Sequence, residues 1–123
     1  MEAKLVRDKI PDLIRANGAD PVVWRATDEE YCDLLLHKLR EEVQEFLEAK
    51  SLEELADVLE VVQTLATALG FEPKDLERMR ARKASERGGF NGKLVWSGNR
   101  PTAEKDGESL IRFSSAGLGR PQG

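Results

Sequence analysis

Apolar residues recur at helical spacing over two adjoining stretches of the chain, residues 28–49 and 52–69. On a wheel of about 100° per residue, those of the first stretch fall in one arc: Cys32, Leu35, Leu36, Leu39, Val43, Phe46 and Leu47. The arc of the second stretch is much wider: Leu52, Leu55, Val58, Leu59, Val61, Val62, Leu65, Ala66 and Leu69. A helix that is apolar over so much of its surface needs partners on two sides. The pattern therefore predicts two long helices with additional packing partners.

Capping and stop signals mark the ends of these two helices. Thr27-Asp-Glu-Glu matches a capping box, in which a threonine and a glutamate three residues later satisfy each other's backbone N–H groups. Gly70 is suited to end the second helix, because glycine tolerates the left-handed backbone of a C-terminal cap. Only Lys50-Ser51 separates the two stretches. So short a turn predicts antiparallel neighbours.

Shorter elements flank the long pair. Pro11 suits the first turn of a short helix that Gly18 ends, and Pro73 starts a further helix that runs to about Arg87. Residues 21–26 and 93–96 are short β-like runs that could pair as a small ribbon.

These elements predict an all-α fold: an oligomeric helical bundle of two long antiparallel helices plus shorter ones. A chain of 123 residues is long enough for one domain with a modest core, which we place at residues 1–96. Residues 97–123 are rich in Gly, Ser, Pro and Arg and are typical of a flexible tail.

Four acids lie on or beside the apolar arcs. Glu42 falls inside the first arc and Glu45 at its edge; Glu54 falls inside the second, and Asp57 about 60° further round. Antiparallel packing would turn all four toward one gap. A carboxylate directed at a core costs several kcal/mol unless it is paired or binds a metal. Since oxygen ligands alone suit Mg²⁺ or Mn²⁺, the pattern predicts a site for such an ion.

Other interpretations of these acids remain open. Ser51-x-x-Glu54 is also a capping box, so Glu54 could bond only to the Ser51 amide. Glu45 lies near Lys38 on the wheel and could form an ion pair with it. The remaining glutamates are typical of solvated faces: Glu41, Glu48, Glu53 and Glu60.

Composition excludes several classes of protein. The net charge of −4 gives no general basic surface, which argues against duplex nucleic acid as a binding partner. The single cysteine, Cys32, lies on an apolar face, so neither a disulfide framework nor a Cys/His zinc site is expected. No apolar run is long enough to span a bilayer and no leader pattern opens the chain. We therefore expect a cytoplasmic protein that does not bind membranes.

Two pairs of basic residues are candidate ligands for phosphate. Arg7 and Lys9 flank the entry to the first short helix, and a solvated face is the alternative interpretation. Lys83 and Arg87 fall on the apolar side of the helix that starts at Pro73. Compensation of the helix dipole is the alternative for this second pair.

Three motifs resemble one known family. Glu41-Glu42-x-x-Glu45 followed by Glu54-x-x-Asp57 is similar to the signature of the MazG-related, all-α nucleoside triphosphate pyrophosphohydrolases. The opening Lys-Leu-Val-Arg-Asp-Lys-Ile-Pro and the later Lys83-x-x-x-Arg87-Gly-Gly-Phe resemble a subgroup predicted to remove noncanonical nucleotides. The resemblance covers about residues 4–96.

The resemblance implies an activity and a role for each matching residue. Glu42, Glu45, Glu54 and Asp57 would bind Mg²⁺, and Lys83 and Arg87 would contact phosphates. For the catalytic role of positioning water we favour Glu45, with Glu41 as the second candidate. The implied reaction is Mg²⁺-dependent hydrolysis of a nucleoside triphosphate, noncanonical or damaged, to a monophosphate and pyrophosphate. The family also implies a homodimer or a homotetramer.

Two other functions remain open at this point. Phosphoribosyl-ATP pyrophosphohydrolases belong to the same superfamily, although the opening motif argues against that substrate. A non-catalytic helical dimer that binds a basic partner protein through its acids would need no metal.

Overall fold

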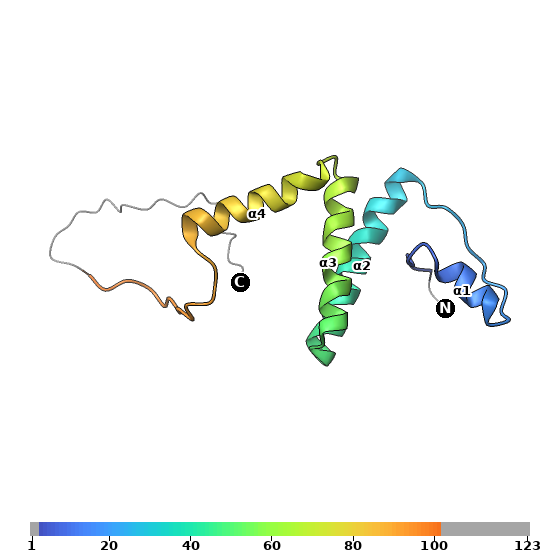
Figure 1. The fold of residues 1–123 in the computed structure, drawn as a ribbon, viewed down its shortest axis with the longest axis horizontal. Helices are drawn as coiled ribbons and strands as arrows, with labels where there is room; N and C mark the ends of the chain where they lie inside the picture. Colours follow the sequence, from blue (N-terminus) through green and yellow to red (C-terminus); the bar gives the residue numbers. More distant parts are fainter. Residues whose placement is uncertain (1–2, 102–123) are drawn as a thin grey trace. The chain divides into compact units, whose positions relative to one another are not determined.

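The computed structural model describes residues 3–101, which form four helices and no strand. Their bounds are α1, Ile10–Ala16; α2, Asp28–Ala49; α3, Leu52–Ala68; and α4, Pro73–Arg87 (Figure 1). The chain divides into one unit that extends to Gly89 and another that begins at Phe90. The all-α fold class is confirmed for the described residues. The predicted tail falls largely on residues 102–123, which lie outside them.

Local capping fixes the ends of the two long helices. At the start of α2, Thr27 Oγ1 accepts a hydrogen bond from the Glu30 N–H, and the Glu30 carboxylate accepts one from the Thr27 N–H, both at 3.1 Å. This confirms the capping box. At the other end, Lys50 adopts a left-handed backbone with φ of 51°, and its N–H donates to Phe46 O. The chain then enters α3 at once, so α2 and α3 become neighbours.

The core of the first unit lies between α2 and α3. Leu35 of α2 and Val61 and Leu65 of α3 are its buried apolar side chains. Partly buried residues surround them: Leu5, Tyr31, Leu39 and Ala68. Leu35 is near the beginning of α2, whereas its partners are in the second half of α3. The core is small, and it joins the segment before α1 to the helix pair through Leu5.

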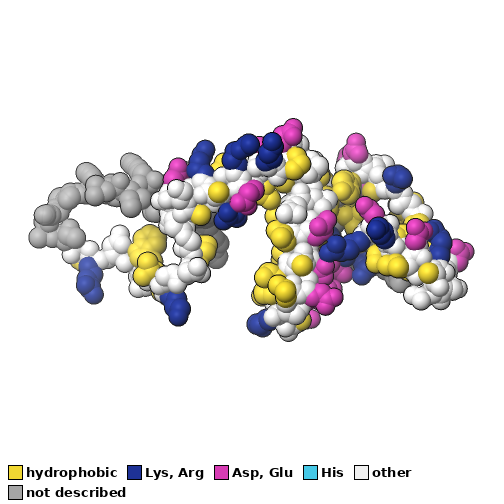
Figure 2. Space-filling view, viewed as in Figure 1, with side chains coloured by type: hydrophobic (Ala, Val, Ile, Leu, Met, Phe, Trp, Pro, Cys, Tyr) yellow, Lys and Arg dark blue, Asp and Glu magenta, His cyan; other side chains and the backbone are white. Residues whose placement is uncertain are grey.

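Much of the apolar arc of α3 is not covered by this core. Four of its leucines are exposed: Leu52, Leu55, Leu59 and Leu69. Three apolar residues of α2 are exposed as well: Leu36, Val43 and Leu47. Figure 2 shows hydrophobic side chains along one edge of this region and acidic side chains beside them. The width of the arc thus exceeds what the other described elements bury.

The predicted β-ribbon is wrong for the described residues. Residues 21–26 and 93–96 form no strand, and their large apolar side chains are exposed, with Val22 at 87% and Leu94 at 95%. Two short strands without a sheet or helix to cover them are marginally stable in water. Pro21 also lacks the N–H that a strand pair would use. In the second unit the local contact is instead a hydrogen bond from Trp96 Nε1 to Asn99 Oδ1 at 3.0 Å.

No helix in the described part of the chain combines the length and the apolar character that crossing a membrane needs.

Candidate metal centre

Three acids from α2 and α3 meet beside the core. Glu42 comes from α2, while Glu54 and Asp57 lie one turn apart on α3. One carboxylate oxygen from each lies within 4.8 Å of the other two. A small oxygen-binding cation could reach all three through modest side-chain movements. Helical periodicity predicts a common gap for these same three acids.

Two oxygens of this acidic group are buried without a hydrogen-bond partner. They are Oε1 of Glu42 and Oε1 of Glu54. The Glu42 side chain is only 9% exposed. A buried polar atom without a partner is costly, because it has lost its water and gained nothing in return. These two oxygens therefore remain available for a ligand.

The capping interpretation of Glu54 explains its backbone but not its side chain. Ser51 Oγ accepts a hydrogen bond from the Glu54 N–H at 3.2 Å. The reciprocal bond that completes the boxes at Thr27 and Glu72 is not formed at Ser51. Capping thus leaves the Glu54 carboxylate free to face the acidic group.

The electrostatic environment disfavours a charged Glu54. Burial raises the pKa of Glu54, and repulsion by Glu45, Asp57, Glu42 and the adjacent Glu53 raises it further. Ionised Glu54 therefore costs stability in the metal-free protein at neutral pH, and its protonation relieves that cost.

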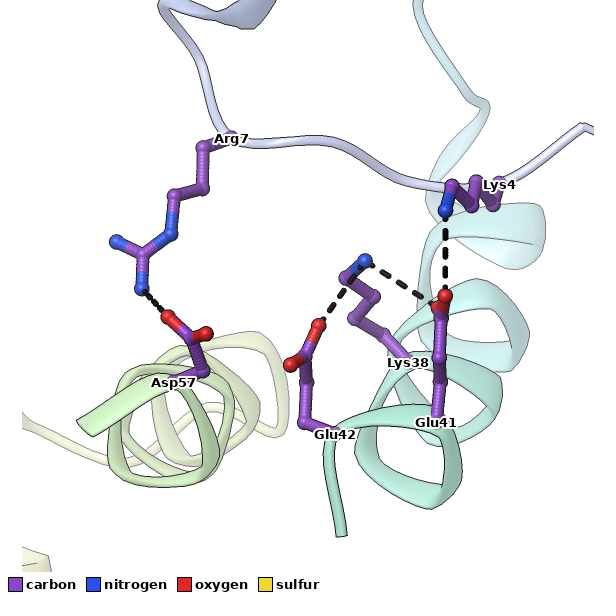
Figure 3. A network of polar contacts seen from close by, with 6 residues as sticks. All are labelled: Lys4, Arg7, Lys38, Glu41, Glu42 and Asp57. Carbon is purple, nitrogen blue, oxygen red and sulfur yellow. Dashed lines mark hydrogen bonds and ion pairs between the residues drawn. The ribbon is translucent and has the colours of Figure 1, made fainter. Parts of the chain in front are cut away.

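Two lysines form ion pairs with the acids of α2 at this site. Lys38 Nζ lies 3.1 Å from Glu42 Oε2 and 3.2 Å from Glu41 Oε1 (Figure 3). Lys4 Nζ lies 3.2 Å from the other oxygen of Glu41. Burial acts to raise the pKa of Glu41, but the hydrogen bonds from Lys38 and Lys4 outweigh it and lower that pKa. Glu41 thus acts as the counter-ion of two lysines.

An arginine forms an ion pair with one of the two acids of α3. Arg7 Nη2 donates to Asp57 Oδ1 at 2.5 Å (Figure 3). The hydrogen bond with Asp57 raises the pKa of Arg7, so the guanidinium stays charged. The Arg7 side chain is 55% exposed and the Asp57 side chain 30%, so this ion pair is accessible to solvent.

The cations compensate only part of the negative charge. Two lysines and one arginine contact Glu41, Glu42 and Asp57, whereas Glu45 and Glu54 add their charge at the same place. Figure 2 shows the acidic side chains gathered next to basic ones in this region. The remaining negative charge favours a bound cation.

The other predicted site residues lie around or away from this group. Glu45 is exposed, and it is not one of the three acids whose carboxylate oxygens lie within 4.8 Å of one another. Its charge nevertheless acts on Glu54. Lys9 is the exposed N-cap residue of α1. Lys83 and Arg87 are exposed on α4.

Sequence reasoning assigned no role to Lys4 or to the contact of Lys38 with Glu41 and Glu42. The Lys38 contacts have a local signal, since residues three and four apart face each other on a helix. The Lys4–Glu41 pair joins residues 37 positions apart, so no short-range pattern marks it.

Comparison with known proteins gives limited similarity. No family model matches the chain, and no solved structure matches it. An uncharacterised protein of Mycolicibacterium smegmatis (strain ATCC 700084 / mc(2)155) is 56% identical over 43 residues, which are 35% of this chain and 44% of that protein. The match thus spans less than half the length of this curated relative.

We predict that Glu54→Gln raises the melting temperature of the protein at pH 7 in the presence of a chelator. Because the folded-state pKa is above the ordinary value, the benefit should shrink as pH falls through the folded-state pKa. It should vanish below the ordinary carboxyl pKa of about 4.3. Thermal melts at pH 7 and pH 4 measure this difference.

Glu53→Gln is the matched control, because Glu53 is in the same first turn of α3 and is exposed. Both substitutions lose the same favourable interaction with the helix dipole. An equal effect of the two substitutions at both pH values would contradict the repulsion assigned to Glu54.

Proposed function

We propose that this chain is a cytoplasmic, Mg²⁺-dependent nucleoside triphosphate pyrophosphohydrolase that acts on a noncanonical or damaged nucleotide. The observation that carries the proposal is the acidic group of Glu42, Glu54 and Asp57, in which two buried carboxylate oxygens have no partner. The resemblance of the acidic and flanking motifs to the MazG-related enzymes supports the same activity.

The chemistry of the donors fits the proposed ion. All three groups offer carboxylate oxygens, the ligand type that Mg²⁺ and Mn²⁺ prefer, and no sulfur or imidazole competes for it. Glu45, whose charge already acts on Glu54, would complete the set of four acids by a change of rotamer. Bound Mg²⁺ would supply neutralisation of phosphate charge and activation of water.

The residues of the chain would then divide the remaining work. Glu45, which is exposed and whose charge acts on Glu54, would accept a proton from the attacking water, with Glu41 as the second candidate. As water adds to phosphorus, the P–O bond between the α- and β-phosphates breaks and pyrophosphate departs. Arg7, the cation nearest to Asp57, would hold a phosphate oxygen by a charge-assisted hydrogen bond.

The other basic candidates would contribute from the periphery. Lys9, Lys83 and Arg87 are exposed and would meet the phosphates only after a nucleotide or a second copy of the chain brings them nearer. The motifs that contain them support their assignment as phosphate ligands.

The proposal includes an assembly of at least two copies. In this proposal α2 and α3 form an antiparallel pair within one copy, and the exposed leucines of α3 pack against another copy. Such apolar patches are typical of interaction surfaces. The proposed assembly is a homodimer or a homotetramer.

One observation favours a different function. The acids already form ion pairs with Lys4, Arg7 and Lys38 of the same chain. A basic partner protein could use the same carboxylates without metal.

Phosphoribosyl-ATP is the alternative substrate within the enzymatic hypothesis.

We predict that Glu42→Gln and Asp57→Asn keep the helical fold but lower turnover by at least about a hundredfold, because each removes a charged ligand. Pyrophosphate release should be measured with Mg²⁺ over a panel of canonical, oxidised and deaminated nucleotides and phosphoribosyl-ATP. Circular dichroism checks the fold of each variant.

Glu48→Gln is the control for this experiment, since Glu48 is an exposed glutamate of α2 outside the cluster. Turnover at the parent rate in Glu42→Gln or Asp57→Asn would refute the assignment. Activity confined to phosphoribosyl-ATP would select the alternative substrate.

We also predict that Leu59→Asp converts the assembly into monomers, because a carboxylate in an apolar interface is costly to desolvate. Light scattering coupled to size-exclusion chromatography gives the mass. Val22→Asp, at another exposed apolar residue outside the helices, should leave the mass unchanged. If the parent chain is already monomeric, the proposed assembly is wrong.

A further inference from the structure

The segment before α1 lies across the acidic cluster. Its described residues, 3–9, are not helical, and three of their side chains reach the helix pair: Lys4 contacts Glu41 of α2, Leu5 packs against the core, and Arg7 contacts Asp57 of α3. Figure 3 shows the backbone of this segment passing over the carboxylates. Leu5 thus fixes the segment in place, and the two basic side chains reach opposite helices.

The contacts of these two cations have different consequences for a metal site. Lys4 pairs with Glu41, which is not one of the three acids that share a common reach. Arg7 pairs with Asp57, which is one of them. A divalent ion at the three acids would therefore meet the positive charge of Arg7 and compete with it for the same carboxylate.

Arg7 does not satisfy all the oxygens of the three acids. The side chain of Glu42 is 91% buried, since 9% is exposed, and its free Oε1 belongs to the same group as Asp57. Arg7 contacts Asp57 through one nitrogen. It leaves both unpaired oxygens of Glu42 and Glu54 without a hydrogen bond.

We propose that Arg7 is a displaceable counter-ion that couples the metal site to the phosphates of the substrate. In the metal-free protein it neutralises Asp57; when a divalent cation binds Asp57, the guanidinium turns to a phosphate oxygen. This inference rests on the proposed function and adds an order of binding to it, metal first and nucleotide second.

The geometry around Arg7 permits such an exchange. Its side chain is 55% exposed, so it can rotate without disturbing the core, while Leu5 keeps the backbone over the site. An exposed ion pair contributes little stability, so a divalent cation can displace it. A guanidinium matches the geometry of phosphate oxygens as well as that of a carboxylate.

The proposal predicts opposite effects of one substitution on two ligands. In Arg7→Gln, Mn²⁺ alone should bind about two- to fivefold more tightly, because its competitor at Asp57 is gone. Pyrophosphate should bind about tenfold more weakly at saturating Mg²⁺, because a charge-assisted hydrogen bond is lost. Arg7→Lys, which keeps the charge, should bind Mn²⁺ like the parent chain. Isothermal titration of the full chain measures each affinity.

Arg15→Gln is the matched control. Arg15 has a similar exposure, 50%, and a similar ion pair, with Asp12 on α1, but it is not part of the cluster. It should change neither affinity. Circular dichroism establishes that each variant is folded. A second test needs no substitution: in the parent chain, the Nε–Hε NMR signal of Arg7 should move on addition of Mg²⁺.

The outcomes separate this inference from the function on which it rests. Unchanged or weaker Mn²⁺ binding by Arg7→Gln, in a chain whose parent binds Mn²⁺ and hydrolyses nucleotides, overturns the role of Arg7 alone. Tighter Mn²⁺ binding with unchanged pyrophosphate affinity overturns the coupling. A parent chain that binds no Mn²⁺ overturns both the inference and the proposed function.

Discussion

Repulsion among carboxylates at the contact between α2 and α3 is the constraint on which this structure depends. The helices are joined by two residues, and the turn brings Glu42 against Glu54 and Asp57. A sequence selected only for stability would place apolar residues at these positions. The chain instead surrounds the acids with Lys4, Arg7 and Lys38 and still leaves two buried oxygens without partners. Retained electrostatic cost of this kind is typical of a binding site.

The small core and the acidic cluster are two parts of one arrangement. Leu35, Val61 and Leu65 hold α2 and α3 together at one position along the helix pair, and the acidic cluster lies at another position along the same pair. The apolar side chains that the core leaves exposed give a physical reason for assembly with another copy. The proposed second copy would stabilise the helix pair by covering these apolar side chains, beside which acidic side chains lie (Figure 2).

Helical periodicity was sufficient to predict the parts of the structure that depend on neighbours in sequence. The capping box at Thr27, the turn at Lys50-Ser51 and the inward direction of Glu42 and Glu54 all follow from residues within one or two turns. The ribbon of residues 21–26 and 93–96 failed because a short run of β-forming residues becomes a strand only where a partner covers it. Arg7–Asp57 joins residues 50 positions apart, and tertiary contacts of that range carry no local signature. For the same reason the sequence suggested Arg7 as a phosphate ligand without indicating its carboxylate partner.

Paramagnetic NMR with Mn²⁺ tests the central claim most directly, because it locates the ion without assuming any substrate. If the carboxylates form a metal site, substoichiometric Mn²⁺ should broaden first the amide signals around Glu42, Glu54 and Asp57, and a chelator should restore them. Broadening that begins at exposed acids elsewhere, such as those of α4, with the signals of these three residues unaffected, would contradict the account.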